Sequence, residues 1–483
     1  MQRDVNNAIR RATIFTIGVL LLYAAVIHAQ ATTITVTDTN DSGPGSLRQA
    51  LADANDGDTI NFDVSLKGQT IALISGELVI DKSITITGLG SDQLAVSADF
   101  QYHFRIFHVM ASPTVIIEGL TIGPSLYFYG CGIQNDQAIL TINNCAVAGN
   151  AGLDSGAGIS NGGTLTVNNS SITGNGLEYQ GTGAGISSSG TLIINNSIIG
   201  GNVSGKGYTD GGGIYSSGML EITNSTIDGN SVGGRGGGIY NVGVAIITSS
   251  TISGNFAGGG YPFPPGPGFG GGISSNGAGA TVTISNSTIS GNSVLTTDKG
   301  PGRGGGIGNS GSLQIANSTI SGNSATDGGA ICNDAAPLEI ANSILNAGDV
   351  GENIFNDGGT ITSLGYNLSS DNGGGYLNGP GDQTNTDPIL GPLQDNGGPT
   401  QTHRPYPQSP AIDAGDPSFT PPPFYDQRGT EFDRVVNGRI DIGSFEVQEG
   451  KPPPSSPTPT PTPSLTPRPT PTPRPRLTPR PRP

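Results

Sequence analysis

The stretch GGGIYSSGMLEITNSTIDGN, residues 211–230, decides the fold, because it returns with few changes along the middle of the chain. It recurs as GGGISSNGAGATVTISNSTISGN at residues 270–292 and as GGGIGNSGSLQIANSTISGN at residues 304–323. The Ile after the glycines returns every 24 to 34 residues, at Ile133, Ile159, Ile186, Ile214, Ile239, Ile273, Ile307 and Ile331. A repeat in this range is typical of a solenoid.

Inside one unit, apolar residues alternate with polar ones, which is the period of a β-strand. In residues 164–172, Leu165, Val167 and Ile172 occupy inward positions and Thr166 faces outward. Short strands of this kind cannot bury their inner face alone, but stacking one coil on the next pairs each strand with its copies. The repeat therefore predicts an all-β parallel β-helix.

Two sets of Asn recur at corners of the coil. The first set falls at inward parity after the second strand, so we predict that its side chains hydrogen-bond as a buried ladder. The second set follows Gly at another corner, where we expect the left-handed backbone that Asn tolerates. The first set is Asn144, Asn169, Asn196, Asn224, Asn286, Asn317 and Asn342, and the second is Asn150, Asn175, Asn202, Asn230, Asn255, Asn292 and Asn323.

The ends of the chain differ from the repeat. Residues 1–31 place Arg before an apolar run and a small-residue site, which predicts a cleaved signal peptide, with an uncleaved anchor as the alternative. We expect residues 32–355 to form the β-helix, with a short amphipathic helix closing its start. Residues 356–447 are predicted to form a C-terminal cap, and the Pro-, Thr- and Arg-rich residues 448–483 a disordered tail.

Charge is distributed unevenly along the chain. The residues after Gly450 contain six of the 21 Lys and Arg residues and none of the 37 Asp and Glu residues. The chain before them therefore carries a net charge of −22, against −16 for the whole. An acidic body disfavours nucleic acid as a partner, and we expect the folded domain not to be embedded in a membrane. Three Cys residues are too few for a disulfide scaffold.

Both ends of the folded region carry a family likeness. The opening VTDTNDSGPGSLRQALADANDGDTINF at residues 36–62 and the closing phrases DPILGPLQDNGGPTQTH, SPAIDAGD, DQRG and DIGSFE resemble bacterial right-handed parallel β-helix proteins that end in a choice-of-anchor module. The resemblance covers about residues 32–447 and implies a right-handed, pectin-lyase-like β-helix on an exported, surface-associated protein. The GGAI at residues 328–331 is similar, more faintly, to the repeats of polymorphic outer-membrane proteins.

The sequence offers little for catalysis, although several β-helix relatives are polysaccharide lyases or hydrolases. Glycoside hydrolysis needs two carboxylates flanking one bond, yet the outward Glu221 and Asp228 have no carboxylate neighbour in their columns. His103, His108 and His403 lie apart from other metal-ligand motifs, and we interpret the first two as structural residues on strands. We therefore assign no catalytic and no metal-binding residue, and keep a polysaccharide lyase or glycoside hydrolase as the alternative function.

Acidic residues gather in the final module, at Asp413, Asp416, Asp426, Asp441 and Glu446. We interpret them as residues that close turns and pair with Arg428 or Arg439. A bound Ca²⁺ is the alternative, because this ion prefers oxygen ligands.

The loops between a corner Asn and the next glycine run vary in length, and all open along one edge of the solenoid. Such one-sided insertions are commonly the binding face of repeat proteins. Aromatic residues collect there, at Tyr179, Tyr208, Tyr261, Phe263 and Phe269, with Tyr215 and Tyr240 outward on the adjacent strand. We predict that they bind sugar or peptide, the alternative being that they pack loops onto the neighbouring coil. The sequence thus predicts a monomeric, secreted or cell-surface protein that binds a glycan or an envelope component without catalysis.

Overall fold

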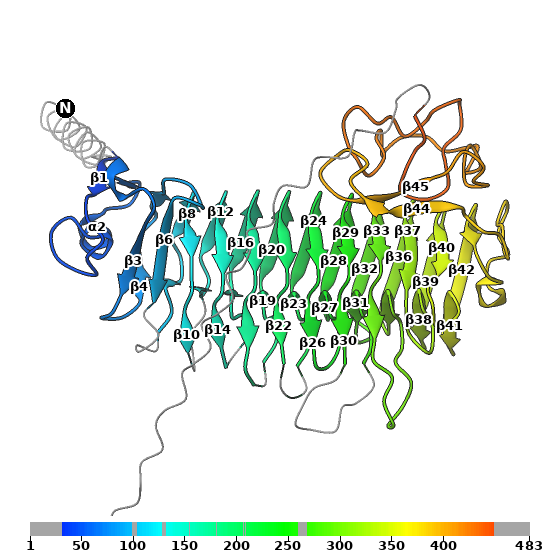
Figure 1. Cartoon of the computed structure of the whole chain (residues 1–483), viewed down its shortest axis with the longest axis horizontal. Coiled ribbons are helices and arrows are strands. Elements are labelled where there is room, and N and C mark those ends of the chain that lie inside the picture. Colours follow the sequence, from blue (N-terminus) through cyan, green and yellow to red (C-terminus); the bar gives the residue numbers. More distant parts are fainter. Residues whose placement is uncertain are drawn as a thin grey trace, which may run out of the picture.

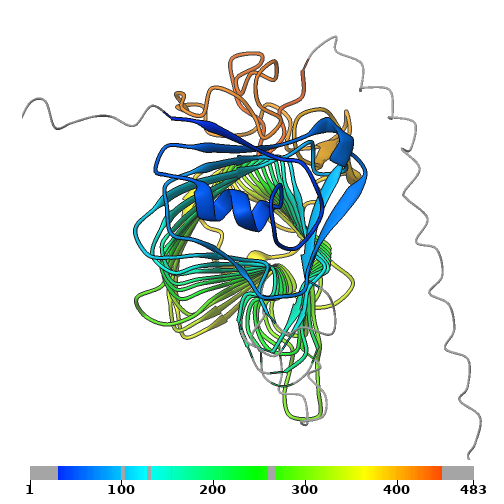
Figure 2. The ribbon, with the colours of Figure 1, turned by 90° about the vertical axis from the view of Figure 1, so that its left-hand side faces the viewer.

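The chain folds into stacked coils, each of which passes through up to four parallel sheets. The computed structural model describes residues 31–98, 104–127, 132–153, 155–179, 181–205, 207, 209–258 and 268–448. In a repeating coil the chain runs through sheets C, A, B and D in turn. The coils form an elongated right-handed parallel β-helix (Figure 1, Figure 2), which confirms the predicted fold class.

Sheets A and B form two of the walls along most of the solenoid. Sheet A contains β1 (Thr33–Val36), β2 (Thr59–Phe62), β5 (Thr85–Thr87), β8 (Thr114–Glu118), β12 (Ile139–Asn143), β16 (Thr164–Asn168), β20 (Thr191–Asn195), β24 (Met219–Thr223), β28 (Val244–Thr248), β32 (Thr281–Ser285), β36 (Ser312–Ala316), β39 (Pro337–Ala341) and β42 (Thr360–Gly365). Sheet B contains β3 (Gln69–Leu73), β6 (Leu94–Ala98), β9 (Thr121–Ile122), β13 (Ala146–Ala148), β17 (Ser171–Thr173), β21 (Ile198–Gly200), β25 (Thr226–Asp228), β29 (Thr251–Ser253), β33 (Thr288–Ser290), β37 (Thr319–Asn323), β40 (Ile344–Ala347) and β43 (Leu368–Ser369).

Sheet C is the third wall, and the short strands of sheet D form a lobe beside it. Sheet C contains β4 (Leu78–Ile80), β7 (Phe107–Val109), β11 (Ile133–Asn135), β15 (Ile159–Asn161), β19 (Ile186–Ser188), β23 (Ile214–Ser216), β27 (Ile239–Asn241), β31 (Ile273–Ser275), β35 (Ile307–Asn309), β38 (Ile331–Asp334) and β41 (Ile354–Asp357). Sheet D contains β10 (Leu126–Tyr127), β14 (Ala151–Gly152), β18 (Gly176–Leu177), β22 (Val203–Ser204), β26 (Ser231–Val232), β30 (Phe256–Ala257) and β34 (Ser293–Val294).

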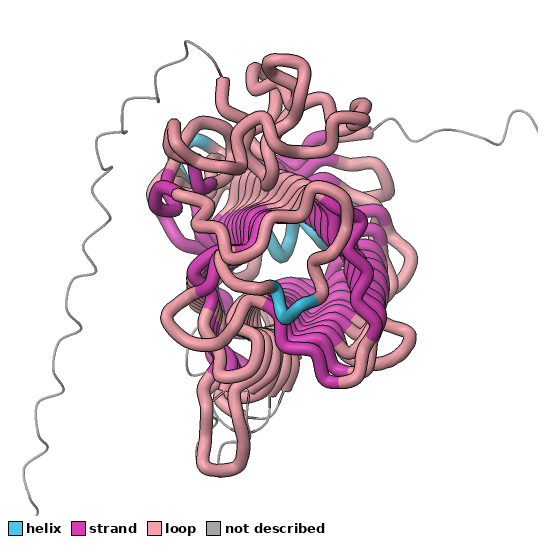
Figure 3. The backbone as a smooth tube through the Cα atoms, turned by 90° about the vertical axis from the view of Figure 1, so that its right-hand side faces the viewer, coloured by secondary structure: helices cyan, strands magenta, loops and turns pink. Residues whose placement is uncertain are grey.

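The inward columns predicted from the repeat form one continuous core. Leu165, Val167 and Ile172 are fully buried, as are their counterparts in neighbouring coils. The start of the stack is covered by α2 (Leu47–Asp53) (Figure 2). Its apolar side chains are buried in the core. Near the other end, η2 (Gly373–Gly375) packs beside the last coils (Figure 3). The buried Leu377 follows it in the sequence. A further 3-10 turn, η1 (Val64–Leu66), lies between β2 and β3.

The two Asn sets exchange the roles predicted for them. The second set, not the first, is the buried ladder: its members are at most 1% exposed. Asn202 Nδ2 donates to Asn230 Oδ1 at 2.9 Å, and Asn230 Nδ2 donates to Asn255 Oδ1 at 2.9 Å. Each amide also bonds a backbone carbonyl, as Asn230 Nδ2 does with Ile199 O at 2.9 Å. The predicted ladder was therefore assigned to the wrong corner.

The first Asn set forms the left-handed corner between sheets A and B. Its members have φ between 47° and 52°, and Ser249, which interrupts the set, has φ 49°. Asn144, Asn169 and Asn196 are exposed there, so parity along the strand does not carry through the corner. The residue that follows each Asn is buried instead, Cys145 after Asn144 and Ser after the others. Ser197 Oγ, for example, accepts from the backbone N–H of Ser170 at 3.1 Å.

The predicted C-terminal cap is only partly a cap. Residues 386–447, the flanking module, pack along the outer side of sheet B over β29, β33, β37 and β40 (Figure 1). The module contains the antiparallel pair β44 (Leu390–Gln394) and β45 (Thr402–Pro405). Outward hydroxyls of sheet B bond to it: Thr288 Oγ1 donates to Gln427 Oε1 at 2.6 Å and Thr251 Oγ1 to Gln401 O at 2.6 Å. These contacts place the module on a side wall, which sequence-local patterns did not predict.

The predicted signal peptide and the predicted tail lie almost entirely outside the described residues, because the structure does not describe residues 1–30 and 449–483. In the ranges that the structure describes, no helix is long and apolar enough to cross a membrane.

Candidate binding face on sheet C

Two columns of side chains run side by side along the outer face of sheet C. The outer strip comprises the outward residues of its strands: Val79, His108, Gln134, Ser160, Ser187, Tyr215, Tyr240, Ser274, Gly308, Cys332 and Phe355. The bridge column comprises residues five positions earlier in each coil, joined by single backbone bridges: Thr182, Asp210, Arg235, Phe269, Arg303 and Asp327. The glycine runs between the columns are required by geometry. Gly236 has φ 68°, and a Cβ there would lie 2.4 Å from Ile239 O.

The centre of this face holds a stacked pair of tyrosines. The rings of Tyr215 and Tyr240 have centroids 5.6 Å apart at an interplanar angle of 17°. Arg235 lies over the Tyr240 ring at 5.5 Å from its centroid and pairs with Asp210 at 3.4 Å. Asn276 Nδ2 donates to Tyr240 Oη at 2.6 Å. The Tyr240 ring is therefore held by a charged and an amide group, and the Tyr215 ring stacks on it.

The two tyrosines differ in exposure, which corrects the prediction that both face solvent. Tyr215 is half-buried, whereas Tyr240 is only 5% exposed beneath its neighbours. Burial raises the pKa of the Tyr240 hydroxyl, and the nearby Asp210 carboxylate raises it further. Burial also raises the pKa of Asp210 itself, against the lowering effect of Arg235. Tyr215 thus presents the accessible ring and Tyr240 supports it.

Of the other predicted aromatic residues, the structure describes Phe269 and Tyr179. Phe269 lies in the bridge column, and its ring occupies the space above Gly308, where a Cβ would approach the ring to 2.6 Å. Tyr179 is 55% exposed on the loop after β18. Tyr208, Tyr261 and Phe263 lie outside the described residues. The structure therefore brings together Tyr215 and Tyr240, and gives Phe269 the packing role named as the alternative.

One end of the face carries a charged group that sequence reasoning missed. His108 on β7 lies between two carboxylates, with Nδ1 3.0 Å from Glu77 Oε1 and Nε2 3.0 Å from Asp136 Oδ2. Arg105 Nε pairs with Glu77 Oε2 at 2.9 Å. His108 does lie on a strand, as predicted. Its partners come from the coils before and after it. Finding them from the sequence requires the register of these coils, and the glycine run that marks the register begins only at Ile133.

The other end carries a second ionic group around Arg303. This guanidinium hydrogen-bonds Asp357 and lies 3.5 Å from Asp327 and 4.0 Å from Asp334. It also covers the Phe355 ring at 5.3 Å from the centroid. Beneath it, burial raises the pKa of the Cys332 thiol to about 12, so this thiol is not a nucleophile at neutral pH.

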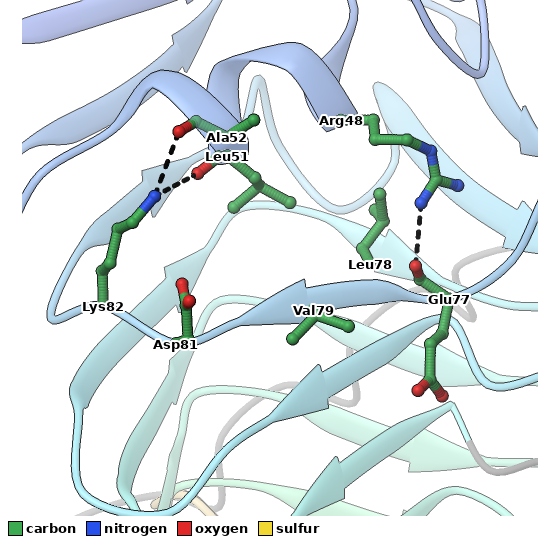
Figure 4. Close-up of a pocket in the computed structure, with 8 residues that line it drawn as sticks. All are labelled: Arg48, Leu51, Ala52, Glu77, Leu78, Val79, Asp81 and Lys82. Atoms are coloured by element: carbon green, nitrogen blue, oxygen red, sulfur yellow. Dashed lines mark hydrogen bonds between the residues drawn. The ribbon is translucent and has the colours of Figure 1, made fainter.

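A cleft of about 270 Å³ opens where the outer strip begins, between α2 and β4 (Figure 4). Its lining residues are Arg48, Leu51, Ala52, Glu77, Leu78, Val79, Asp81 and Lys82. Lys82 Nζ donates to the carbonyls at the end of α2, Leu51 O at 3.2 Å and Ala52 O at 3.1 Å. Arg48 donates to Glu77 O at 2.8 Å. The cleft is thus fixed by side chain to backbone bonds, and Val79 is 46% exposed beside it.

The acidic residues of the flanking module do not converge on a metal site. Within the described ranges, no group of three or more His, Cys, Asp and Glu side chains could hold a metal ion. Asp426 pairs with Arg428 at 2.6 Å, and Asp416 accepts from the backbone and hydroxyl of Ser418 at 2.8 and 2.7 Å. Asp413 N donates to Asp441 Oδ1 at 2.7 Å. These carboxylates serve turns and ion pairs.

A fully buried guanidinium sits at the centre of the module. Arg434 is 0% exposed, donates to Gly443 O at 2.7 Å, and has Nη1 3.9 Å from Glu446 Oε2. Burial and the neighbouring Asp441 raise the pKa of Glu446 to about 9, and burial raises the pKa of Asp441 to about 6. The carboxyls of Asp426, Asp441 and Glu446 therefore share the guanidinium groups of Arg428 and Arg434. The Glu446 carboxyl keeps its proton at neutral pH.

Comparison with known proteins identifies no family. No protein-family model matches the chain, and no curated protein matches its sequence. Among solved structures it is similar to pectate lyase Pel9A, at 14% identity over 87% of this chain and 97% of the lyase, with a TM-score of 0.47. It is also similar to the catalytic unit of a GH87 α-1,3-glucanase from Streptomyces thermodiastaticus, at 15% identity over 71% and 70% of the two chains, with a TM-score of 0.40.

A third similar structure is the PL6 family alginate lyase AlyGC, at 13% identity over 86% of this chain and 59% of the lyase, with a TM-score of 0.35. Similarity at these levels carries no argument about substrate or activity. The parallel β-helix is established by the strand pairing of the chain itself.

Proposed function

We propose that this protein is an exported, non-catalytic β-helix that binds a glycan along the outer face of sheet C. The observation that carries the proposal is the half-buried Tyr215 ring, which stacks on Tyr240; the Tyr240 ring in turn lies under Arg235, the partner of Asp210. A fixed planar ring beside carboxylate and amide groups suits a sugar, because the ring covers apolar C–H surface and the polar groups bond hydroxyls at low entropic cost.

The part of the strip before Tyr215 supports an extended ligand rather than a single sugar. Its outward residues Gln134, Ser160 and Ser187 are small or flexible, and all are half-buried. The strands beneath them repeat about every 4.8 Å, so equivalent polar groups recur at short, regular intervals. A polymer lying along the solenoid axis would reach from Tyr215 towards the cleft beside Val79.

A polysaccharide lyase or glycoside hydrolase is the second candidate, and His108 is the observation that favours it. Its imidazole lies between two carboxylates on a partly exposed surface, with 15% of its side chain accessible. A general base needs a free nitrogen within reach of the substrate proton, whereas both ring nitrogens of His108 already face carboxylate oxygens. Two carboxylates that flank a glycosidic bond also need room for it, and here the imidazole occupies that room. The geometry therefore favours binding over catalysis.

The test is a glycan array followed by titration calorimetry on the array hits, with wild type and Tyr215→Ala. We expect the variant to bind at least tenfold more weakly, a loss of ~1.4 kcal/mol. Tyr406→Ala is the matched control, because Tyr406 is 48% exposed on the flanking module, away from sheet C. Equal affinity of wild type and Tyr215→Ala would refute the site.

The same hits, incubated with the protein, test the enzymatic alternative. New unsaturated or reducing ends that are lost in His108→Gln would overturn the non-catalytic assignment.

The proposal includes export and retention at the cell envelope, with a glycan or envelope component rather than nucleic acid as the partner and a monomer as the binding unit. The signal-like residues 1–31 and the basic tail of residues 448–483 support it, because six positive charges can hold to anionic wall polymers by screened attraction. Cell fractionation with and without residues 448–483 tests retention. Identical wall-associated amounts would remove the tail from this role.

A further inference from the structure

We infer that the glycan bound along sheet C is an uncharged, hydroxyl-rich polysaccharide and not a polyuronate or sulfated polymer. The inference rests on the proposed function and follows from the ion pairs of the same face. Among the described residues of the outer strip, the bridge column and their direct partners, the acids are Glu77, Asp136, Asp210, Asp327, Asp334 and Asp357, and the guanidinium groups are Arg105, Arg235 and Arg303.

Each guanidinium on this face faces a carboxylate of the protein, most loosely at Arg235, whose side chain is 44% exposed. Arg105 pairs with Glu77 at 2.9 Å, Arg235 with Asp210 at 3.4 Å, and Arg303 is surrounded by three aspartates. Recognition of a carboxylate or sulfate relies on Arg or Lys donors that can turn to the ligand. At Arg105 and Arg303 an anionic sugar would have to displace an internal carboxylate, which would then be left without its partner.

The acids that remain accessible outnumber the cations that could offset them. The side chains of Asp357, Asp334 and Asp136 are 56%, 40% and 38% exposed, against 44% for Arg235, 29% for Arg105 and 23% for Arg303. A polyanion laid along the strip would therefore meet surface carboxylates at both ends of its path. Like charges at contact distance repel even in water, although salt screens them.

Carboxylates in this setting favour hydroxyl donors. An ionised Asp has two oxygens that only accept hydrogen bonds, and it can take two hydroxyls of one sugar ring. The cleft at the end of the strip has the same character. Its Asp81 residue is exposed, while Arg48 and Lys82 already donate hydrogen bonds to backbone carbonyls. The stacked tyrosines supply the apolar contact, so an uncharged sugar chain satisfies the whole face.

The experiment measures affinity by calorimetry for a neutral oligosaccharide and an oligouronate of equal length, at low and at moderate salt. We expect the neutral ligand to bind more tightly, with an affinity that does not change with salt. The oligouronate is expected to bind detectably only as salt screens the acids.

The double variant Asp334→Asn/Asp357→Asn sharpens the test. Oligouronate affinity should rise by about fivefold for each carboxylate removed, the factor expected for one charge pair at contact distance in water. Neutral-ligand affinity should not rise. An unchanged circular dichroism spectrum and melting temperature establish that the variant is folded.

The outcomes separate this inference from the function on which it rests. If wild type binds the oligouronate as tightly as the neutral ligand and Tyr215→Ala weakens both, the face binds glycans but the inference is wrong. If Tyr215→Ala leaves every affinity unchanged, or if neither ligand binds, the proposed function fails.

Discussion

The two Asn corners of the coil use the same residue for opposite purposes. At the corner between sheets B and D, Asn230 is fully buried and its amide bonds the coils on both sides. At the corner between sheets A and B, Asn169 is exposed with φ 48°, so its backbone conformation is what the coil requires. Where the flanking module covers this second corner, Asn342 is 4% exposed and bonds the module. Burial therefore has two independent sources, the coil interior and a distant segment.

The largest expected difference in stability is between a substitution in the buried Asn ladder and one at the exposed corner between sheets A and B. Asn230→Asp removes the amide donors that reach Asn255 and Ile199 and places a charge in a buried row. We expect a loss of roughly several kcal/mol in the free energy of unfolding. Asn169→Asp should change it by no more than about 0.5 kcal/mol, because this side chain faces water. Chemical denaturation measures both, and equal midpoints would show that the ladder does not stabilise the stack.

The next largest difference in stability is between an Asn of the A–B corner that the module covers and one that faces solvent. Asn342→Gly keeps the left-handed backbone relaxed but removes the amide that bonds Asn317 Oδ1 at 2.9 Å and Asp441 O at 3.2 Å. We expect it to cost about 1–3 kcal/mol, against less than about 0.5 kcal/mol for Asn169→Gly. Matching losses at both positions would mean that the module contributes nothing at this corner.

A pH-dependent effect is expected in the region that the flanking module covers. The pKa of Glu446 is raised to about 9 in the folded chain, so the folded state holds a proton that the unfolded chain releases above its ordinary pKa of 4.5. The resulting stability is fully present below pH 4.5 and is lost as pH rises towards 9. Asp441, raised to about 6, acts in the same direction. We expect the melting temperature to fall over this range by a few degrees.

Glu446→Gln provides the matched control, because an amide cannot release a proton. Its melting temperature should vary less with pH than that of wild type over the same range. Parallel curves for the two proteins would assign the pH dependence to other groups.

The smallest effect is expected on the open wall of sheet A. Thr166 faces outward between Leu165 and Val167 and is half-buried without a contact to the module. Thr166→Ala should change the free energy of unfolding by no more than about 0.5 kcal/mol. A larger loss would indicate that a partner or a second surface covers this wall.

How much of this structure the sequence predicts depends on how far apart the contacting residues lie in the sequence. Inward residues such as Val167 and Ile172 follow from the period of two, which holds within a strand. The same parity does not continue through a corner, and for this reason Asn169 and Asn175 were assigned each other's roles. Contacts such as that between Thr288 and Gln427 join residues 139 positions apart, and no local pattern records them.

The candidate site was predictable to a similar degree. Tyr215 and Tyr240 could be placed together because the glycine runs align their coils. Arg235 and Asp210 stand five residues earlier in the same aligned coils, outside the apolar alternation that marks the strands, so only the structure places the bridge column beside the strands. The His108 group lies in coils without the glycine signature, and its geometry therefore had no sequence signal.

The placement of the flanking module also determines how such a chain can grow or shorten by duplication. Between Thr251 and Leu368 the module contacts particular residues of several successive coils. These contacts fix the number of coils in this part of the solenoid. Coils ahead of that region carry no such constraint. Deleting residues 159–185, one whole coil, would leave every ladder amide opposite an equivalent neighbour, whereas deleting residues 273–306 would move the anchoring hydroxyls out of register. Length variation among descendants of this chain should therefore collect in the first half of the solenoid, which is also where the open part of the sheet C face lies.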